Sequence, residues 1–213
     1  MSVLVALTGS DASLVATDSR RIGPDGTFRD DFRKTFRLSS ASIVGGHTGL
    51  LEFSGRSIPE WLETLPLVSL TTLDDVARQA KLMFEAEMSS ISACEVAFQH
   101  RLSDVVLVGY YDLGRRRSPV LIRAIVMRPD TASNRVLGEV REFAGFCATG
   151  DDDAKNAVLS GVSAMRPAPH ALPKKRLAVA ARNLIALGVR SAGMSPNFPG
   201  VNSCGGPASI VLL

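Results

Sequence analysis

The apolar residues of this 213-residue chain recur with two periods, which predict strands in some stretches and helices in others. Short runs rich in branched apolar residues begin almost at the N-terminus and return in the middle and at the end of the chain. They predict strands over 3–7, 13–17, 36–38, 42–45, 105–111, 120–127, 140–148 and 208–213. The polar Gly9-Ser10-Asp11 turn joins the first two runs into a hairpin.

Between the groups of strands, apolar residues recur every three to four positions, as in a helix that buries one face. They predict helices over 49–65, 72–90, 151–165 and 177–189. Thr71-Thr72 and the acidic residues after it suit a helix start, as do the three aspartates from Asp151, because hydroxyls cap helices and acids favour the positive end of the dipole. Residues 191–203 are rich in Gly, Pro, Asn and Ser and predict a loop.

The order of the predicted elements is strand pairs, two helices, strand pairs, two helices and one last strand. Runs of strands followed by pairs of helices favour antiparallel sheets with helices on their outer faces. Two such sheets stacked face to face, with a helix pair outside each, form an α+β fold, a four-layer αββα sandwich. The length and the absence of an internal repeat predict a single domain over residues 1–213.

The composition is that of a globular protein, with 46% hydrophobic and 21% charged residues. The net charge is only +3, the basic runs at 115–117 and 174–176 lie far apart, and 6% of residues are aromatic. We therefore expect no nucleic-acid partner. The longest apolar stretches are shorter than a membrane span and the N-terminus lacks the pattern of a signal peptide, so we expect no membrane partner and a cytoplasmic location.

The cysteines are Cys94, Cys147 and Cys204, an odd number at wide spacing. They form neither a disulfide framework nor a Cys/His cluster of the kind that binds zinc. We therefore expect no cofactor and no metal ion.

Three polar residues lie in or beside the N-terminal strands. Ser2 heads the first predicted strand once Met1 is removed, Asp18 ends the second and Lys34 comes just before the third. In an antiparallel meander, the start of one strand and the end of the next lie at the same edge of the sheet. We therefore expect Ser2, Asp18 and Lys34 to converge at one rim.

These residue types suit nucleophilic catalysis. A serine hydroxyl is a weak nucleophile until a base takes its proton, and the α-amino group of an N-terminal serine, with a pKa of roughly 7.7–8.0, is such a base. Lys34 would favour deprotonation through its positive charge, and Asp18 would keep that lysine charged and oriented. The backbone N–H of Gly46, in the Gly45-Gly46 pair, is a candidate donor to a developing oxyanion.

The spacing of these residues resembles that of proteasome β-subunits and of the related bacterial ring protease of the heat-shock locus, which are N-terminal-nucleophile hydrolases. Those proteins carry a nucleophilic threonine first, an Asp-x-Arg sixteen positions later and a lysine thirty-two positions after the threonine. Asp18-Ser19-Arg20 and Lys34 stand at these distances from Ser2. Gly46 stands where the family has the glycine of its oxyanion hole. Serine supports the same chemistry without the methyl group that fixes the threonine rotamer.

Two later stretches resemble supporting parts of the family's site. Ala148-Thr149-Gly150 lies where the family has Gly-Ser-Gly, which implies a supporting hydroxyl from Thr149. Asn202-Ser203-Cys204-Gly205-Gly206 resembles the Asp-Ser-Gly-Ser-Gly-Gly before the family's last strand, which implies supporting roles for Ser203 and Asn202. His47, beside Gly46, fits both a contact to substrate and a structural role.

The resemblance implies a self-compartmentalising peptidase that cleaves peptide or amide bonds with the serine exposed by removal of Met1. It implies a homo-oligomeric ring that admits unfolded polypeptides or peptides, with the predicted helices 49–65 and 72–90 at the subunit contacts. Whether an ATPase unfoldase feeds the ring stays open. Two other functions fit the same residues: a catalytically inactive ring or scaffold subunit, and a small-amide hydrolase with the same nucleophile.

Overall fold

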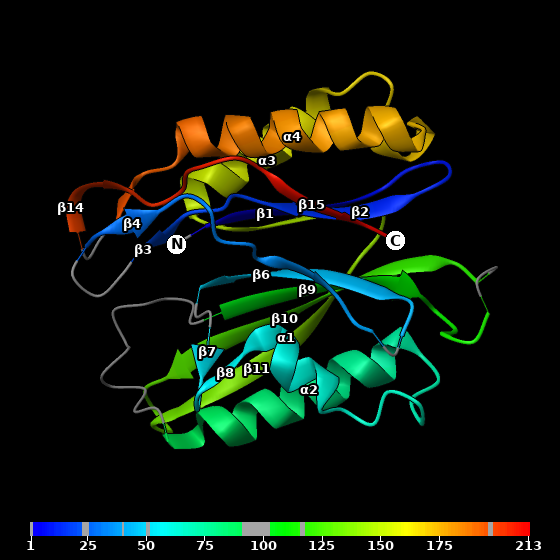
Figure 1. Cartoon of the computed structure of the whole chain (residues 1–213), viewed down its shortest axis with the longest axis vertical. Helices are drawn as coiled ribbons and strands as arrows, with labels where there is room; N and C mark the ends of the chain where they lie inside the picture. Colours follow the sequence, from blue (N-terminus) through cyan, green and yellow to red (C-terminus); the bar gives the residue numbers. More distant parts are fainter. Residues whose placement is uncertain are drawn as a thin grey trace.

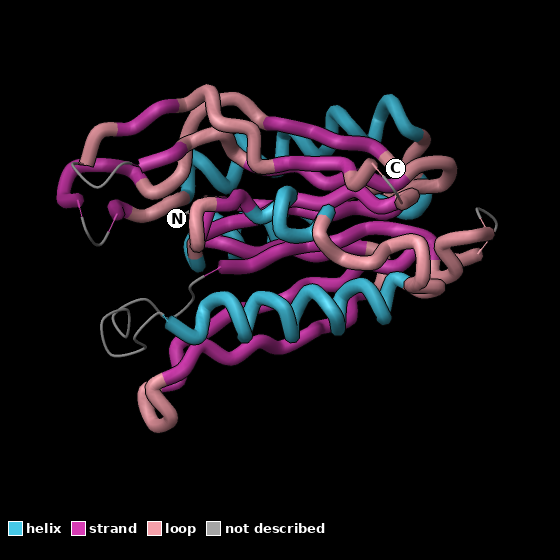
Figure 2. The backbone as a smooth tube through the Cα atoms, turned by 60° about the horizontal axis from the view of Figure 1, so that its bottom comes forward, coloured by secondary structure: helices cyan, strands magenta, loops and turns pink. Residues whose placement is uncertain are grey.

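A computed structural model of the chain describes residues 2–22, 26–39, 41–49, 52–90, 103–115, 118–195 and 198–213. These residues form four layers in the order helices, sheet, sheet, helices (Figure 1). This is the predicted αββα sandwich. The N-terminal and C-terminal ends lie at opposite ends of the layers, which Figure 2 shows from a second direction.

The first sheet has the strand order β12-β1-β2-β15, and all its neighbours are antiparallel. Helices α3 and α4 cover its outer face (Figure 1). The bounds are β1 Val3–Thr8, β2 Ser13–Thr17, β12 Phe146–Gly150, β15 Ser209–Leu212, α3 Asp152–Ala164 and α4 Lys174–Ser191.

The second sheet has the order β11-β10-β9-β6-β5 and is also antiparallel throughout. Helices α1 and α2 lie on its outer face (Figure 1). The bounds are β5 Thr35–Arg37, β6 Ile43–Gly49, β9 Ser103–Tyr110, β10 Val120–Asp130, β11 Arg135–Phe143, α1 Ile58–Glu63 and α2 Leu73–Glu87.

Short elements complete the described chain. They are three small hairpins and two 3-10 turns, namely β3 Arg21–Ile22 with β4 Phe28–Arg29, β7 Glu52–Phe53 with β8 Arg56–Ser57, β13 Met194–Ser195 with β14 Phe198–Asn202, η1 Met88–Ser90 and η2 Pro169–Ala171.

The apolar core has three parts, one at each interface between layers. Strand β1 shows how the period of two divides residues between them. Val3, Val5 and Leu7 pack in the cluster shared with α3 and α4, whereas Leu4 and Ala6 pack in the cluster between the sheets. Because β1 is buried on both faces, it reads as an unbroken apolar run.

The helix predicted over 49–65 is wrong over most of its length, since α1 starts only at Ile58. The preceding residues form the β7–β8 hairpin, in which Ser54 and Gly55 both have positive φ (50° and 73°). Two successive positive φ values make a tight hairpin turn and end any helix. Pro59 then stands in the first turn of α1, where proline is tolerated.

The strand predicted over 140–148 is in fact two strands in different sheets. Gly145, with φ of 79°, lies between β11 and β12, where the chain crosses from the second sheet to the first. The apolar pattern does not show this crossover, because Phe143 and Phe146 on either side of it are both partly buried, although in different clusters. Helix α4 is also longer than predicted, and the predicted loop over 191–203 contains the β13–β14 hairpin.

Candidate active site

Ser2, Asp18 and Lys34 meet at the end of the first sheet where β1 begins and β2 ends. The Lys34 Nζ atom lies 2.6 Å from Ser2 Oγ and 3.2 Å from Asp18 Oδ1. All three residues are buried, with 3% of Ser2, 0% of Asp18 and 1% of Lys34 exposed. A lysine this deeply buried is rare unless it is paired, and here Asp18 is its partner.

The carboxylate of Asp18 is held from several directions. Oδ1 accepts the backbone N–H of Val3 at 3.0 Å as well as Lys34. Oδ2 accepts the backbone N–H groups of Arg20 at 3.3 Å and Gly205 at 3.2 Å. These donors come from β1, from the segment after β2 and from the loop before β15. They fix the position of the carboxylate.

Burial lowers the pKa of the Lys34 ammonium group below its ordinary value of 10.5. The charge of Asp18 and its hydrogen bond to Lys34 oppose this shift. Asp18 therefore helps Lys34 to remain an ammonium group that donates to the Ser2 hydroxyl. Because Lys34 is buried, it nevertheless loses its proton more easily than a solvent-exposed lysine does.

The backbone of Ser2 is held by the junction of β12 and α3. The backbone N–H of Asp151 donates to the carbonyl oxygen of Ser2 at 2.7 Å. Gly150 has φ of 114°, and a Cβ atom there would lie 1.9 Å from the same oxygen. Only glycine leaves room for this contact.

Ser203 and Asp151 form a second buried group next to this junction. The Ser203 hydroxyl donates to Asp151 Oδ2 at 2.9 Å, and Asp151 Oδ1 accepts the backbone N–H of Ala154 at 3.1 Å, which caps α3. Asn202 Oδ1 accepts the backbone N–H of Cys204 at 3.0 Å, which shapes the loop. Ser203 thus reaches Ser2 through Asp151 and the backbone.

A third group braces the loop before β15. The Arg20 guanidinium binds both carboxylate oxygens of Asp30 at 2.7 Å and donates to the backbone oxygen of Asn202 at 3.3 Å. A Cβ atom on Gly205 would lie 2.2 Å from the Arg20 guanidinium carbon. The hydrogen bond from Arg20 holds the pKa of Asp30 below its usual value. This ion pair therefore lies directly over the glycine that donates to Asp18.

Thr149 and Gly46 do not join the group around Ser2. Thr149 faces the space between the sheets, where its hydroxyl donates to the Asp104 carboxylate of β9. Gly46 lies in the middle of β6, and a Cβ atom there would lie 2.9 Å from both Leu4 and Val15 of the first sheet.

The N–H directions along β6 show where the Gly46 amide points. The backbone N–H of His47 donates to the Lys34 oxygen at 3.1 Å, on the β5 side of the strand. Since N–H groups alternate along a strand, that of Gly46 points toward β9. The His47 ring is buried on the outer face of the second sheet, 6.4 Å from the ring of Phe36, away from the space between the sheets.

Sequence reasoning did not identify Asp151 and Asp30 as parts of the site. The sequence pattern indicates only a helix start at Asp151, although its place directly after Thr149-Gly150 is a usable signal. Asp30 stands in a segment of mixed charges with nothing to single it out. In the described part of the chain, no group of three or more His, Cys, Asp or Glu residues has the arrangement of a metal site. None of the helices described is long and apolar enough to span a bilayer.

No protein-family model and no curated protein matches this sequence. Solved structures do match. One is Anbu (ancestral beta-subunit) from Yersinia bercovieri, with a TM-score of 0.64 and 15% identity over 99% of this chain and 80% of that one. Another is the Anbu (Gly-1) mutant from Hyphomicrobium sp. strain MC1, with a TM-score of 0.62 and 14% identity over 100% of this chain and 81% of that one.

Identities this low make the likeness one of fold. The match runs over nearly the whole chain, so it covers both sheets and both helix layers. The chain therefore has the proteasome-like N-terminal-nucleophile fold that the spacing of Ser2, Asp18 and Lys34 predicted.

Proposed function

We propose that this chain is a proteasome-like peptidase whose nucleophile is Ser2, which becomes the N-terminal residue when Met1 is removed. The observation that carries the proposal is the 2.6 Å contact between Lys34 Nζ and Ser2 Oγ, with Asp18 3.2 Å from the same nitrogen. A buried cation held against a serine hydroxyl by a buried carboxylate is an arrangement that activates a nucleophile.

In the proposed reaction, Ser2 Oγ attacks the carbonyl carbon of the substrate amide. Its proton passes through a water molecule to the freed α-amino group and from there to the leaving amine as the C–N bond breaks. Water then hydrolyses the ester on Ser2 and regenerates the hydroxyl. Lys34 stabilises the developing alkoxide through its charge, and Asp18 orients Lys34.

The supporting residues keep this geometry in place. Asp151 fixes the backbone of Ser2 through its N–H, and Ser203 fixes Asp151. The proposal assigns no oxyanion contact to Gly46, because its N–H is directed toward β9. Thr149 is assigned to the contact between the sheets and not to the reaction.

The proposal includes self-assembly of the chain into a ring that encloses the site and takes unfolded polypeptide or peptide substrates. The proteasome-like fold supports it. The proposed location is the cytoplasm. Native mass measurement tests the assembly, and a closed ring would favour a peptidase over a hydrolase of small amides.

A catalytically inactive scaffold subunit is the second candidate, and one observation favours it. Only 3% of Ser2 is exposed, and its hydroxyl is occupied by Lys34. A scaffold would keep this buried hydrogen bond for stability and would have no use for a free amine.

Two measurements on purified protein separate the candidates. Intact-mass spectrometry determines whether the chain begins at Ser2, and incubation with a β-lactone probe followed by peptide mapping determines whether Ser2 is acylated. We expect a chain lacking Met1 and one adduct on Ser2, absent from the Ser2→Ala variant and kept in Ser2→Thr. A chain that begins at Ser2 and forms no adduct would refute the peptidase and leave the scaffold.

A further inference from the structure

The helix layer formed by α3 and α4 carries a strong excess of positive charge. Residues 154–213 contain seven Lys and Arg and no Asp or Glu. Over the whole layer, residues 151–191, these seven cations face three aspartates at the start of α3, a net charge of +4. Of these aspartates, Asp151 is buried and Asp152 pairs with Lys155.

The remaining cations of this layer are exposed. They are Arg166, Lys174, Lys175, Arg176, Arg182 and Arg190. Within the described residues, none of the six side chains forms an ion pair. The Asp11 carboxylate accepts the backbone N–H of Lys174 at 2.7 Å and brings one negative charge to the start of α4, so the face keeps a net charge of +3.

The opposite helix layer, formed by α1 and α2, has the reverse balance. Residues 52–90 contain seven Asp and Glu and three Lys and Arg, a net charge of −4. Arg123 of β10 lies under this layer and pairs with Asp74, which leaves the layer negative. The two layers lie on opposite outer sides of the molecule (Figure 1). The chain is therefore a dipole, positive on one side and negative on the other.

We propose that the α3–α4 layer of one copy docks on the α1–α2 layer of a second copy, head to tail. Complementary charge on two different faces of the same chain favours a heterologous contact of this kind. Because the two layers lie on opposite sides of the molecule, this contact stacks copies along one axis, in addition to the lateral contacts that would close the proposed ring. The inference goes beyond the self-assembly of the proposed function and requires no hydrolysis.

Each layer also presents an exposed apolar residue. Val179 on α4 and Leu82 on α2 are both 53% exposed. They supply an apolar centre within a charged rim, which is the usual organisation of a protein–protein interface.

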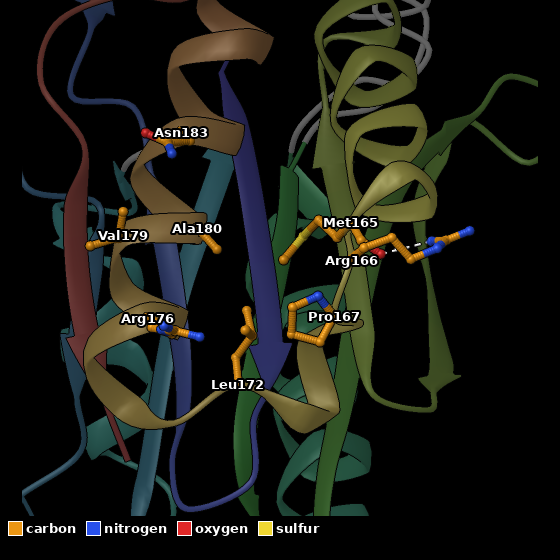
Figure 3. Close-up of a pocket in the computed structure, with 8 residues that line it drawn as sticks. All are labelled: Met165, Arg166, Pro167, Leu172, Arg176, Val179, Ala180 and Asn183. Atoms are coloured by element: carbon orange, nitrogen blue, oxygen red, sulfur yellow. Dashed lines mark hydrogen bonds between the residues drawn. The ribbon is translucent and has the colours of Figure 1, made fainter.

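A pocket of about 280 Å³ lies beside Val179, between the end of α3 and the first turns of α4 (Figure 3). Its apolar lining includes Met165, Leu172 and Ala180, and Arg166 and Arg176 also line it. This pocket has room for an aliphatic side chain such as that of Leu82, and its arginines match the negative layer that carries Leu82.

Other occupants fit this face less well. Two α3–α4 layers placed against each other would bring like charges together, which disfavours a symmetric contact. Residues 154–191 contain no Phe, Tyr or Trp for stacking on bases. The apolar face of α4 is buried against the first sheet, so the helix lacks the free apolar face that inserts into a membrane surface.

The test uses charge reversal on each face, followed by sedimentation velocity of the full chain. Lys175→Glu with Arg176→Glu reverses the positive face. Glu63→Lys with Glu87→Lys reverses the negative face at the last residues of α1 and α2, where a cation suits the helix dipole.

A control pair is matched in charge to the first variant. It is Arg29→Glu with Arg115→Glu, whose side chains are 77% and 83% exposed outside both helix layers.

We expect each reversed variant alone to associate at least about tenfold more weakly, and the control to match the unmodified chain. An equimolar mixture of the two reversed variants regains association, because each now complements the other. Association of the unmodified chain weakens between about 0.05 M and about 0.5 M NaCl, which shortens the screening length roughly threefold. The salt response also tests the contact if a variant fails to fold.

Several outcomes would overturn the proposal. They are a chain that stays monomeric at low salt, reversed variants that associate like the control, and a mixture that fails to regain association. Binding of anionic vesicles or DNA that requires Lys175 and Arg176, with self-association unchanged, would also overturn it. The β-lactone adduct on Ser2 is measured separately, so loss of association and loss of hydrolysis are distinguished.

Discussion

The backbone N–H of Asp151 donates to the carbonyl oxygen of Ser2 at 2.7 Å, which ties the candidate nucleophile to the start of α3. The contact joins residues 149 positions apart in the chain. Asp151 is in turn held by Ser203, so three distant segments determine where the first strand begins. The position of Ser2 therefore depends on the packing of β12 and α3 against β1.

Gly150→Ala tests this dependence. A Cβ atom at Gly150 would lie 1.9 Å from the backbone oxygen of Ser2, which has little freedom to move, and φ is 114°. We expect a loss of about 3 kcal/mol in the free energy of unfolding, or roughly 6–12 °C in melting temperature, with loss of the Ser2 adduct. The control is Gly145→Ala, where φ is 79° but the space is open. Equal losses in the two variants would contradict the steric account.

Lys34→Arg tests the charge beside the Ser2 hydroxyl. Burial lowers the pKa of Lys34 below 10.5, so its positive charge is lost at a lower pH than that of an ordinary lysine. As the pH increases, the rate of adduct formation should first rise as the α-amine loses its proton. It should then fall as Lys34 becomes neutral, and this alkaline fall should begin at a pH lower than 10.5. Arginine keeps its charge, so the variant should react more slowly but keep its rate to higher pH. An alkaline fall at the same pH in both proteins would rule this out.

Asp30→Asn tests the brace over Gly205. The Arg20–Asp30 pair is partly exposed, so we expect a loss of only about 0.5–1 kcal/mol in the free energy of unfolding by urea. Arg20 lowers the pKa of Asp30 below 3.8. The stability that the ion pair contributes is therefore fully present above pH 3.8, and it is lost as the pH falls through the lower pKa that Asp30 has in the folded protein. Asp31→Asn, in the exposed pair with Arg29, is the control and should leave stability unchanged. A loss that persisted in acid would point to packing in place of charge.

The buried thiols should be inert in the folded protein. Burial raises the pKa of Cys204 to about 12, and both Cys204 and Cys147 are 1% exposed. Because the thiolate is the reactive form, iodoacetamide should leave both unmodified in the native chain and label both in guanidinium chloride. Peptide mapping by mass spectrometry reads each site. Labelling of Cys204 in the native chain would indicate that the loop before β15 opens.

Local patterns predicted the layers and the centre of the site. The period of two along β1 and β2 and the short turn between them place Asp18 beside the start of β1, where its carboxylate accepts the N–H of Val3. Hairpin pairing is a local property, so spacing alone predicts it. Lys34 does meet Ser2 and Asp18, as the meander and the family spacing predicted, but it precedes β5 of the second sheet, so its contact depends on how the two sheets stack.

The resemblance was less informative for residues outside that hairpin. Thr149 and Gly46 stand at family positions, yet the hydroxyl of Thr149 binds Asp104 and the N–H of Gly46 points toward β9. Ser203 reaches Asp151 instead of Ser2 itself. Position along the chain does not specify the direction of an N–H or a hydroxyl, because one residue of register reverses it.

The sequence by itself determined the alternating strands, the amphipathic helices and the hairpin that brings Asp18 to Ser2, since each depends on residues a few positions apart. Only the tertiary structure decided that β12 crosses to the first sheet, that Asp151 holds Ser2 and that Arg20 and Asp30 brace Gly205. It also decided that the basic C-terminal residues and the acidic residues of α1 and α2 lie on opposite sides. These relationships depend on which faces of the layers pack together, and only the packing of the whole chain sets that.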